Sequence, residues 1–291
     1  MIRSYLPLFR AVILVGLVSG CASSTQKPDP EAAPLVSLSG NLRVVQLPTT
    51  SGSEPRKQAI TYLILHHTAS GLTSALKTLE GHKVGVHFVV SAEPETRIFR
   101  MCPESRTAYH AGHSAWGKLD GLNHSSVGIE IVNLDGNIHP YPKSQIEALL
   151  SLSQHIITTH KIRPENVLAH SDIAVGRKID PGSLFPWEYF AAHGVGAWPD
   201  AKEFELARIL LKTQRPTADE VRLLLRTYGY RLEDNSEATL KLAIEAFQRH
   251  FRGTKVDGLI DDESVAILQA LVKKYQSPNR PVASPARSKQ T

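Results

Sequence analysis

The hydrophobic periodicity of this chain changes at Trp198-Pro199. Before this point, short β-rich runs alternate with helical spacing, and after it the apolar residues recur only at helical spacing. With 291 residues, 42% of them apolar and 21% charged, the chain is long enough for two globular units. The pattern predicts an α/β domain over residues 46–200, followed by a small all-helical domain over residues 211–275.

The first unit combines β-rich runs with one long helix. Four runs fit short buried strands: Ile60–His67, Val84–Val90, Val127–Val132 and Asn166–His170. Apolar residues at helical spacing predict a helix over residues 144–160, and Ser144 with Glu147 has the spacing of a capping box. Strands that alternate with helices favour a sheet packed between helices.

The second unit contains three predicted helices. Thr217 and Glu220 have capping-box spacing at the start of the first helix, and Gly229 stands where this helix ends. A turn at Asp257-Gly258 separates the second helix from the third. The expected buried positions are Leu240, Ala243, Ile244, Phe247 and Phe251 in the second helix and Val265, Leu268, Leu271 and Val272 in the third.

The amino terminus has the layout of an export signal. Arg3 and Arg10 precede the apolar run Ala11–Val18, which is shorter than the roughly 20 apolar residues that a membrane-spanning helix needs. Small residues then lead to Cys21, as in a bacterial lipoprotein signal, whose cysteine is lipidated and becomes the first mature residue. We predict a signal peptide over residues 1–20 and a lipid anchor on Cys21, with a plain secretory signal as the alternative.

Segments rich in Pro and Ser flank the predicted domains. Residues 21–45 are expected to form a flexible tether, and residues 276–291 a disordered tail. Ala22 directly after Cys21 resembles the sorting pattern for the outer membrane, with the protein facing the periplasm. A lipidated Cys21 leaves Cys102 without a disulfide partner, so we expect Cys102 to be a packing residue.

The charge distribution argues against a nucleic-acid partner. The net charge of +5 is mild, and the basic residues are scattered among 28 acidic ones, so we expect no nucleic acid as a partner. A monomeric protein is a separate expectation. The thirteen histidines are more informative, because such a count suggests metal or proton-transfer chemistry.

Two segments carry the candidate metal ligands. In YLILHHTAS, successive side chains face opposite ways, so only one of His66 and His67 can face a given site, and the alternation does not choose between them. The segment VLAHSDIAVGRKIDPGSLFPW adds His170 and Asp180. A hydrolytic zinc ion takes three protein ligands and a water molecule, and His66, His170 and Asp180 satisfy this requirement. Asp172 is a rival carboxylate, although a loop-capping or supporting role suits it better.

Four sequence blocks resemble, in order, the signature blocks of zinc-dependent N-acetylmuramoyl-L-alanine amidases of the second amidase family. They are ILHHTA, YHAGHSAWG, LNHSSVGIEIVN and AHSDIAVGRKIDPGSLFPW, and the resemblance covers about Leu47 to Trp198. The segment from Gly229 to Leu268 is similar to a three-helix peptidoglycan-binding module. The resemblance implies a central mixed β-sheet flanked by helices, as in peptidoglycan-recognition proteins, plus a small three-helix C-terminal domain.

The resemblance also implies roles for single residues. It selects His66 over His67 as a zinc ligand, together with His170 and Asp180. Glu130 matches the catalytic glutamate of the family, and its neighbours Ile129 and Ile131 would partly desolvate it and raise its pKa. Lys178 matches a basic residue two positions before the ligand Asp and would stabilise an oxyanion.

Other polar residues in these blocks are secondary candidates. His110 and Trp116 belong to the block that lines the substrate groove in similar proteins, so we expect substrate contacts from them, and we include Asn123 and His87 as further candidates. His87 is alternatively a supporting or packed residue. Surface positions are expected for His82, His113, His124, His139, His155, His160, His193 and His250.

The resemblance implies an enzyme that hydrolyses the amide bond between N-acetylmuramic acid and L-alanine in peptidoglycan and muropeptides. The alternatives are a non-catalytic lipoprotein that recognises peptidoglycan and a zinc peptidase that cleaves within the stem peptide. A complete ligand set favours an enzyme, because a pure binder does not need it. The helical domain is expected to bind the cell wall and raise the local substrate concentration, so that its removal would spare the cleavage of small soluble muropeptides.

Overall fold

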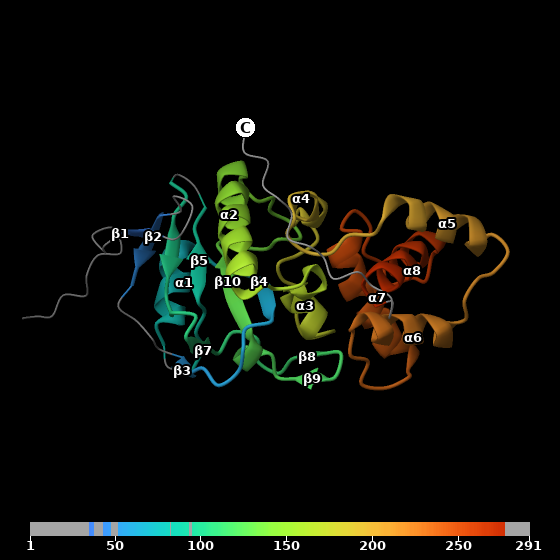
Figure 1. Ribbon diagram of the computed structural model, residues 1–291, viewed down its shortest axis with the longest axis horizontal. Helices are drawn as coiled ribbons and strands as arrows, with labels where there is room; N and C mark the ends of the chain where they lie inside the picture. The colour runs from blue at the N-terminus through green and yellow to red at the C-terminus, as the bar shows by residue number, and fades with distance from the viewer. Residues whose placement is uncertain (1–34, 38–42, 48–51, 82, 93–94, 277–291) are drawn as a thin grey trace, which may run out of the picture.

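The structure, a computed structural model, describes residues 35–37, 43–47, 52–81, 83–92 and 95–276. A mixed β-sheet with helices against it forms one end of the molecule, and a group of helices forms the other, with the short helix α3 (His170–Ile173) between them (Figure 1). The predicted fold class, a central mixed β-sheet flanked by helices with further helices at the C-terminal end, is confirmed.

The central sheet has the strand order β1-β2-β6-β5-β10-β4-β11. Its strands are β1 (Leu35–Ser37), β2 (Arg43–Gln46), β4 (Tyr62–His67), β5 (Phe88–Val90), β6 (Ile98–Arg100), β10 (Ser126–Ile131) and β11 (Val167–Ala169). Strand β10 pairs in parallel with β4 and β5, and β11 pairs in parallel with β4. All four predicted strands are present, three of them shortened and the third shifted by one residue to Ser126–Ile131, and the last one stops at Ala169 because His170 begins α3.

Smaller elements surround this sheet. Two short antiparallel pairs lie beside it, β3 (Ser53–Pro55) with β7 (Arg106–Ala108) and β8 (Ala115–Trp116) with β9 (Leu119–Asp120). The helices of this part are α1 (Leu72–Leu79), α2 (Lys143–His160), α3 and α4 (Trp187–Ala192), with 3-10 turns at Asn123–Ser125 and Pro164–Asn166.

Strand β4 has two buried faces with different neighbours. Leu63 and Leu65 belong to the apolar cluster that includes Leu149 of α2, whereas Ile64 belongs to the cluster that includes Phe247 of α7 (Glu237–Phe251). His66 alternates with Leu65 and therefore shares the face of Ile64. The side chain of His66 thus points away from α2, toward α3.

Helix α2 begins at Lys143, and the capping box expected at Ser144 and Glu147 is wrong. Pro142 is the residue before the helix, and no side chain caps its first turn. The hydroxyl of Ser144 instead accepts a hydrogen bond from Thr96 at 2.9 Å, because a tertiary neighbour competes for the oxygen that the pattern assigned to the helix. The helix ends as expected at His160.

The predicted tether is wrong at its C-terminal end, because β1 and most of β2 lie within residues 21–45. Val44 and Val45 are adjacent and both buried, 0% and 4% exposed, in different apolar clusters on the two faces of the sheet. Burial of both β-branched side chains stabilises a strand that composition alone did not indicate. The predicted signal peptide, Cys21 and the tail after Gln276 lie outside the described residues.

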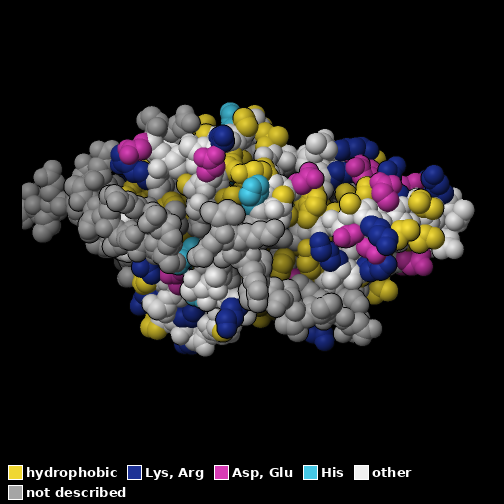
Figure 2. All heavy atoms as spheres, turned by 45° about the horizontal axis from the view of Figure 1, so that its top comes forward, with side chains coloured by type: hydrophobic (Ala, Val, Ile, Leu, Met, Phe, Trp, Pro, Cys, Tyr) yellow, Lys and Arg dark blue, Asp and Glu magenta, His cyan; other side chains and the backbone are white. Residues whose placement is uncertain are grey.

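Helices α5 (Ala201–Leu211), α6 (Ala218–Tyr228), α7 and α8 (Asp262–Tyr275) form the helical module, residues 201–275. The capping box of α6 is confirmed, with the backbone N–H of Thr217 donating to the Glu220 carboxylate at 2.7 Å. Gly229 ends α6 with a φ of 146°. Helix α5 was not predicted, and its N-cap Asp200 accepts hydrogen bonds from the backbone of its first turn. Basic and acidic side chains are intermingled over this end of the molecule (Figure 2).

The helical module shares one apolar core with the α/β part. Ile64, Leu168 and Ile173 lie in the same buried cluster as the inner faces of α6, α7 and α8. Trp116 of β8 packs edge-on against Tyr230, with ring centroids 4.9 Å apart. The two units predicted from the sequence are therefore continuous in packing. Within the described residues, none of the helices combines the length and the apolar character that crossing a membrane requires.

Candidate functional site

The site lies where three parallel strands end side by side. In the ladder between β10 and β4, Glu130 is paired with His66, so both side chains face the same side of the sheet. Strand β11 lies on the other side of β4 and leads directly into His170. Ligands in open α/β sheets bind beyond the carboxyl ends of such strands. The topology alone therefore brings Glu130, His66 and His170 together.

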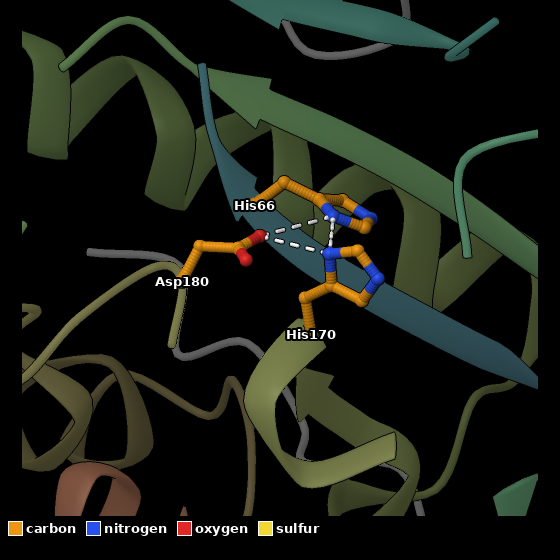
Figure 3. A group of neighbouring side chains, drawn as sticks. All are labelled: His66, His170 and Asp180. Carbon is orange, nitrogen blue, oxygen red and sulfur yellow. Dashed lines mark hydrogen bonds and ion pairs between the residues drawn. The ribbon is translucent and has the colours of Figure 1, made fainter. Parts of the chain in front are cut away.

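His66, His170 and Asp180 form a buried cluster of three ligand atoms (Figure 3). Nδ1 of His66 lies 2.9 Å from Nδ1 of His170 and 3.3 Å from Oδ2 of Asp180. Nδ1 of His170 lies 3.0 Å from the same carboxylate oxygen. The three side chains come from β4, from the start of α3 and from the loop after α3, and they point toward one another.

A chain of hydrogen bonds determines the tautomer of His66. The hydroxyl of Ser126 donates to the carbonyl of Leu122 at 2.7 Å, so its oxygen accepts from Nε2 of His110 at 3.0 Å. Nδ1 of His110 is therefore an acceptor, and Nε2 of His66 donates to it at 3.0 Å. This arrangement leaves Nδ1 of His66 with a free lone pair directed at the cluster.

His170 is oriented in the same manner. Its Nε2 donates to the carbonyl of Ala111 at 3.2 Å, so its Nδ1 also carries a lone pair. Two nitrogen lone pairs and a carboxylate oxygen of Asp180 thus converge within 3.3 Å of one another, an arrangement that suits a bound cation. Ligand atoms about 2.0–2.1 Å from a tetrahedral zinc ion are about 3.3 Å apart, so these residues fit such an ion.

The protonation state of His66 also suits metal binding. Burial and the neighbouring His170 lower the pKa of His66 to about 4, so its imidazole is neutral at pH 7. An imidazole must be unprotonated to bind a metal ion, and His66 meets that condition near neutral pH.

Glu130 is a partly buried carboxyl group next to the cluster. Burial and the negative charge of Asp180 raise its pKa to about 8, and Lys178 partly opposes the rise. Its Oε2 atom is buried without a hydrogen-bond partner among the described residues. Buried polar atoms are almost always paired, so the unpaired carboxylate oxygen beside the cluster makes Glu130 a candidate functional residue.

A cavity of about 490 Å³ opens onto these groups. Glu130, Lys178, His170 and Asp180 line its wall, and so does His110. The cavity wall thus contains both predicted catalytic residues, two of the three predicted ligands and one predicted substrate-binding residue, His110. The third ligand, His66, lies beneath this wall and is 1% exposed. Such a cavity can hold a substrate beside a metal ion, a carboxyl group and a cation.

The structure places the other predicted substrate-binding residues away from the cavity wall. Trp116 is 5% exposed and packs against the helical module. Asn123 accepts a hydrogen bond from the backbone N–H of Ala111 at 2.8 Å, which supports the residue that orients His170. His87 is fully buried and accepts from the backbone N–H of Gly128 at 3.0 Å, and burial lowers its pKa to about 3.

Two further residues near the site have roles that the sequence indicated only in part. The capping role of Asp172 is confirmed, since its Oδ2 accepts from the backbone N–H of Ala169 at 2.8 Å. The surface position expected for His250 is wrong, because this side chain is 2% exposed and bonded to Asp172. No local signal could reveal this bond, whose partners are 78 residues apart. Cys102 is 1% exposed, which confirms that it is a packing residue.

Comparison with known proteins gives consistent matches. Residues 56–183 match the family model described as N-acetylmuramoyl-L-alanine amidase. The chain is 41% identical over 245 residues to the N-acetylmuramoyl-L-alanine amidase AmiD of Escherichia coli K12, and the match covers 79% of this chain and 88% of that protein.

Two solved structures resemble this one over most of its length. AmpDh3 from Pseudomonas aeruginosa, also solved in complex with anhydromuramic pentapeptide, matches with a TM-score of 0.73 and 36% identity over 77% of this chain and 95% of that chain. AmiD from E. coli, in complex with the substrate anhydro-N-acetylmuramic acid-L-Ala-D-gamma-Glu-L-Lys, matches with a TM-score of 0.70 and 36% identity over 84% of this chain and 99% of that chain.

Proposed function

Because this chain belongs to the N-acetylmuramoyl-L-alanine amidase family, we propose that it hydrolyses the amide bond between N-acetylmuramic acid and the L-alanine of the stem peptide, with a zinc ion held by His66, His170 and Asp180. The observation that carries the proposal is a buried cluster of three metal-ligand atoms, two of whose residues line one cavity together with Glu130 and Lys178. Two imidazole nitrogens and a carboxylate are a ligand set typical of hydrolytic zinc.

Each polar group of the cavity has a distinct task. A bound zinc ion supplies Lewis acidity and lowers the pKa of a water molecule to about 7. Glu130 accepts a proton from the attacking water and passes it to the leaving amine of L-alanine, and its raised pKa matches this exchange near neutral pH. Lys178 provides positive charge to the oxyanion of the tetrahedral intermediate.

The cavity is proposed to take a muropeptide. Two similar proteins have been solved with anhydromuramic peptides, which supports a ligand of this class here. His110 is the candidate for direct substrate contact, because it reaches the cavity wall. Trp116, Asn123 and His87 are proposed to act on the site through the protein contacts described above.

The place of the protein in the cell is also proposed. We assign Cys21 as a lipid-modified first residue of a monomeric outer-membrane lipoprotein that faces the periplasm, and the helical module as a part that binds peptidoglycan. Incorporation of labelled palmitate into the wild-type chain, and its absence from Cys21→Ser, tests the anchor. Labelling that is equal in both proteins rejects it.

Digestion of purified peptidoglycan, with and without a chelator, tests the proposed reaction. An amidase releases intact stem peptides that begin with L-alanine, and the chelator stops their release. Shorter peptides would indicate a peptidase, and no product at all would indicate a binding protein. Glu130→Gln should reduce cleavage by about 10²- to 10⁴-fold while zinc binding is retained. Full activity of this variant rejects Glu130 as the general base.

A further inference from the structure

Residues 170–183 carry two of the three ligands and Lys178, yet this segment has little regular structure of its own. Helix α3 ends at Ile173, and the next helix begins at Trp187. Within the segment, the backbone N–H of Ser171 donates to the carbonyl of Asp180 at 3.0 Å, and the other backbone bonds close single turns. The geometry of the ligands therefore depends on what packs against the segment.

The helical module holds the start of this segment through Asp172. This carboxylate is fully buried, and its Oδ1 accepts from the hydroxyl of Tyr230 at 2.6 Å. Its Oδ2 lies 2.6 Å from Nδ1 of His250 and, as noted, caps the backbone just before His170. An ionised carboxylate can only accept, so Nδ1 of His250 donates the hydrogen bond.

His250 is held firmly in its donating position. Its ring is stacked on Trp187, with centroids 3.7 Å apart, and on Phe251, with centroids 4.0 Å apart. Its Nε2 atom is buried without a partner among the described residues. Among the described residues, Asp172 is thus the hydrogen-bond partner of this imidazole. His250 does not line the cavity at the metal cluster.

The module touches the same segment at two more points. Gly176 lies so close to Leu242 of α7 that a Cβ at this glycine would be 2.8 Å from the leucine side chain. A Cβ at Gly253 would lie 2.0 Å from the carbonyl oxygen of Ser183. The contacts at residues 172, 176 and 183 thus flank Lys178 and Asp180 along the chain, and the first of them lies two residues after His170.

We propose that the helical module is a working part of the metal centre, in which Tyr230 and His250 are positioning residues that hold His170 and Asp180 in ligand geometry through Asp172. The inference rests on the proposed zinc site. It goes beyond wall binding, because it gives the module a task at the catalytic end of the molecule. Supporting groups around metal ligands typically change metal affinity by about 10- to 100-fold.

Zinc affinity of the full-length protein, measured by competition with a chromophoric chelator, tests this inference. His250→Phe keeps an aromatic ring between Trp187 and Phe251 but removes the donor, and Tyr230→Phe removes only a hydroxyl. We expect zinc affinity to fall about 10- to 100-fold in the double variant. His250→Asn retains a donor near the position of Nδ1. With Tyr230 intact in both proteins, His250→Asn should therefore bind zinc more tightly than His250→Phe.

Tyr228→Phe is the matched control, because Tyr228 is equally buried in the same core but has no described hydrogen bond to Asp172. Faster amide hydrogen exchange over residues 170–183 in the double variant, but not in the control, supports the positioning role. If a folded double variant has unchanged zinc affinity and unchanged amide hydrogen exchange, the positioning role is overturned, whereas the proposed zinc site stands. A wild-type protein that binds no zinc overturns the proposed site and this inference with it.

Discussion

The backbone segments that carry the two histidine ligands are supported in different ways, although both imidazoles are oriented by groups of the α/β part. His66 lies on a strand between two parallel neighbours, and its imidazole is oriented by His110 and Ser126 from the same α/β part. His170 follows the edge strand β11 and begins a four-residue helix that a distant part of the chain holds in place. A sheet centre is rigid by its own hydrogen bonds, whereas a short segment needs outside support. The metal centre therefore combines an internally supported half with an externally supported half.

Removal of the helical module should have the largest effect. A chain ending before residue 201 leaves Ile64, Leu168 and Ile173 without the apolar partners that cover them. We expect loss of cooperative thermal unfolding and of zinc binding, and therefore no cleavage even of small soluble muropeptides. This outcome reverses the expectation from the sequence that the module serves wall binding alone.

Circular dichroism melting and zinc titration of the truncated chain measure this effect. A truncated protein that melts cooperatively and cleaves soluble muropeptides at the wild-type rate would show that the α/β part is self-sufficient. In that case the module would act through wall binding only.

His110→Leu tests the internally supported half. The substitution removes the acceptor that orients His66, so zinc affinity should fall about 10- to 100-fold, while hydrogen exchange over residues 170–183 stays unchanged. His113→Ala, at an exposed histidine in the same loop, is the control. If His110→Leu and His250→Phe accelerate hydrogen exchange over residues 170–183 equally, the two halves of the metal centre are not supported separately.

Glu130 gives the stability of the metal-free protein a defined pH dependence. Its folded pKa of about 8 exceeds the ordinary 4.5, so the folded state retains a proton that the unfolded chain releases between these values. This contribution to the free energy of unfolding is complete at low pH and is lost as the pH rises toward 8. Glu130→Gln does not titrate, so its stability relative to wild type should increase by several kcal/mol, up to about 5, from pH 4 to pH 9. Denaturant unfolding in a chelator measures the difference, and a pH-independent difference contradicts the raised pKa.

The exposed contact between the two parts should matter least. Arg231 of the module forms an ion pair with Asp120 at 3.0 Å, and both side chains are open to solvent. Exposed pairs contribute roughly 0 to 1 kcal/mol, so Arg231→Ala should barely change the melting temperature or the zinc affinity. A loss comparable to that of the His250 variant would show that the interface as a whole, and not Asp172, supports the ligands.

The sequence predicts the parts of this fold whose determinants are local. Apolar runs and the Thr217 capping box locate the main strands and the start of α6, because the residues that decide them are neighbours in the chain. Strand β2 and helix α5 escaped prediction. In β2, only the sheet reveals that Val44 and Val45 are buried on opposite faces.

For the site, the sequence predicts the ligands themselves but not the residues that support them. Spacing and resemblance identified the ligand set, and the structure brings these atoms together. The supports of the ligands could not be found in this way, because His110 and His250 act across separations of 44 and 78 residues. A histidine that bonds a distant buried carboxylate has the same local sequence as one on the surface.

The close contact between Gly253 and the carbonyl of Ser183 limits the exchange of helical modules between related proteins. A helical cassette taken from another enzyme would bring its own side chains to a joint that tolerates no added carbon atom at Gly253, where a Cβ would lie 2.0 Å from the carbonyl oxygen of Ser183. A successful chimera must therefore carry both faces of the joint together, with the equivalents of His250, Tyr230 and Asp172. The chain is better regarded as one inseparable catalytic body than as an assembly of interchangeable pieces.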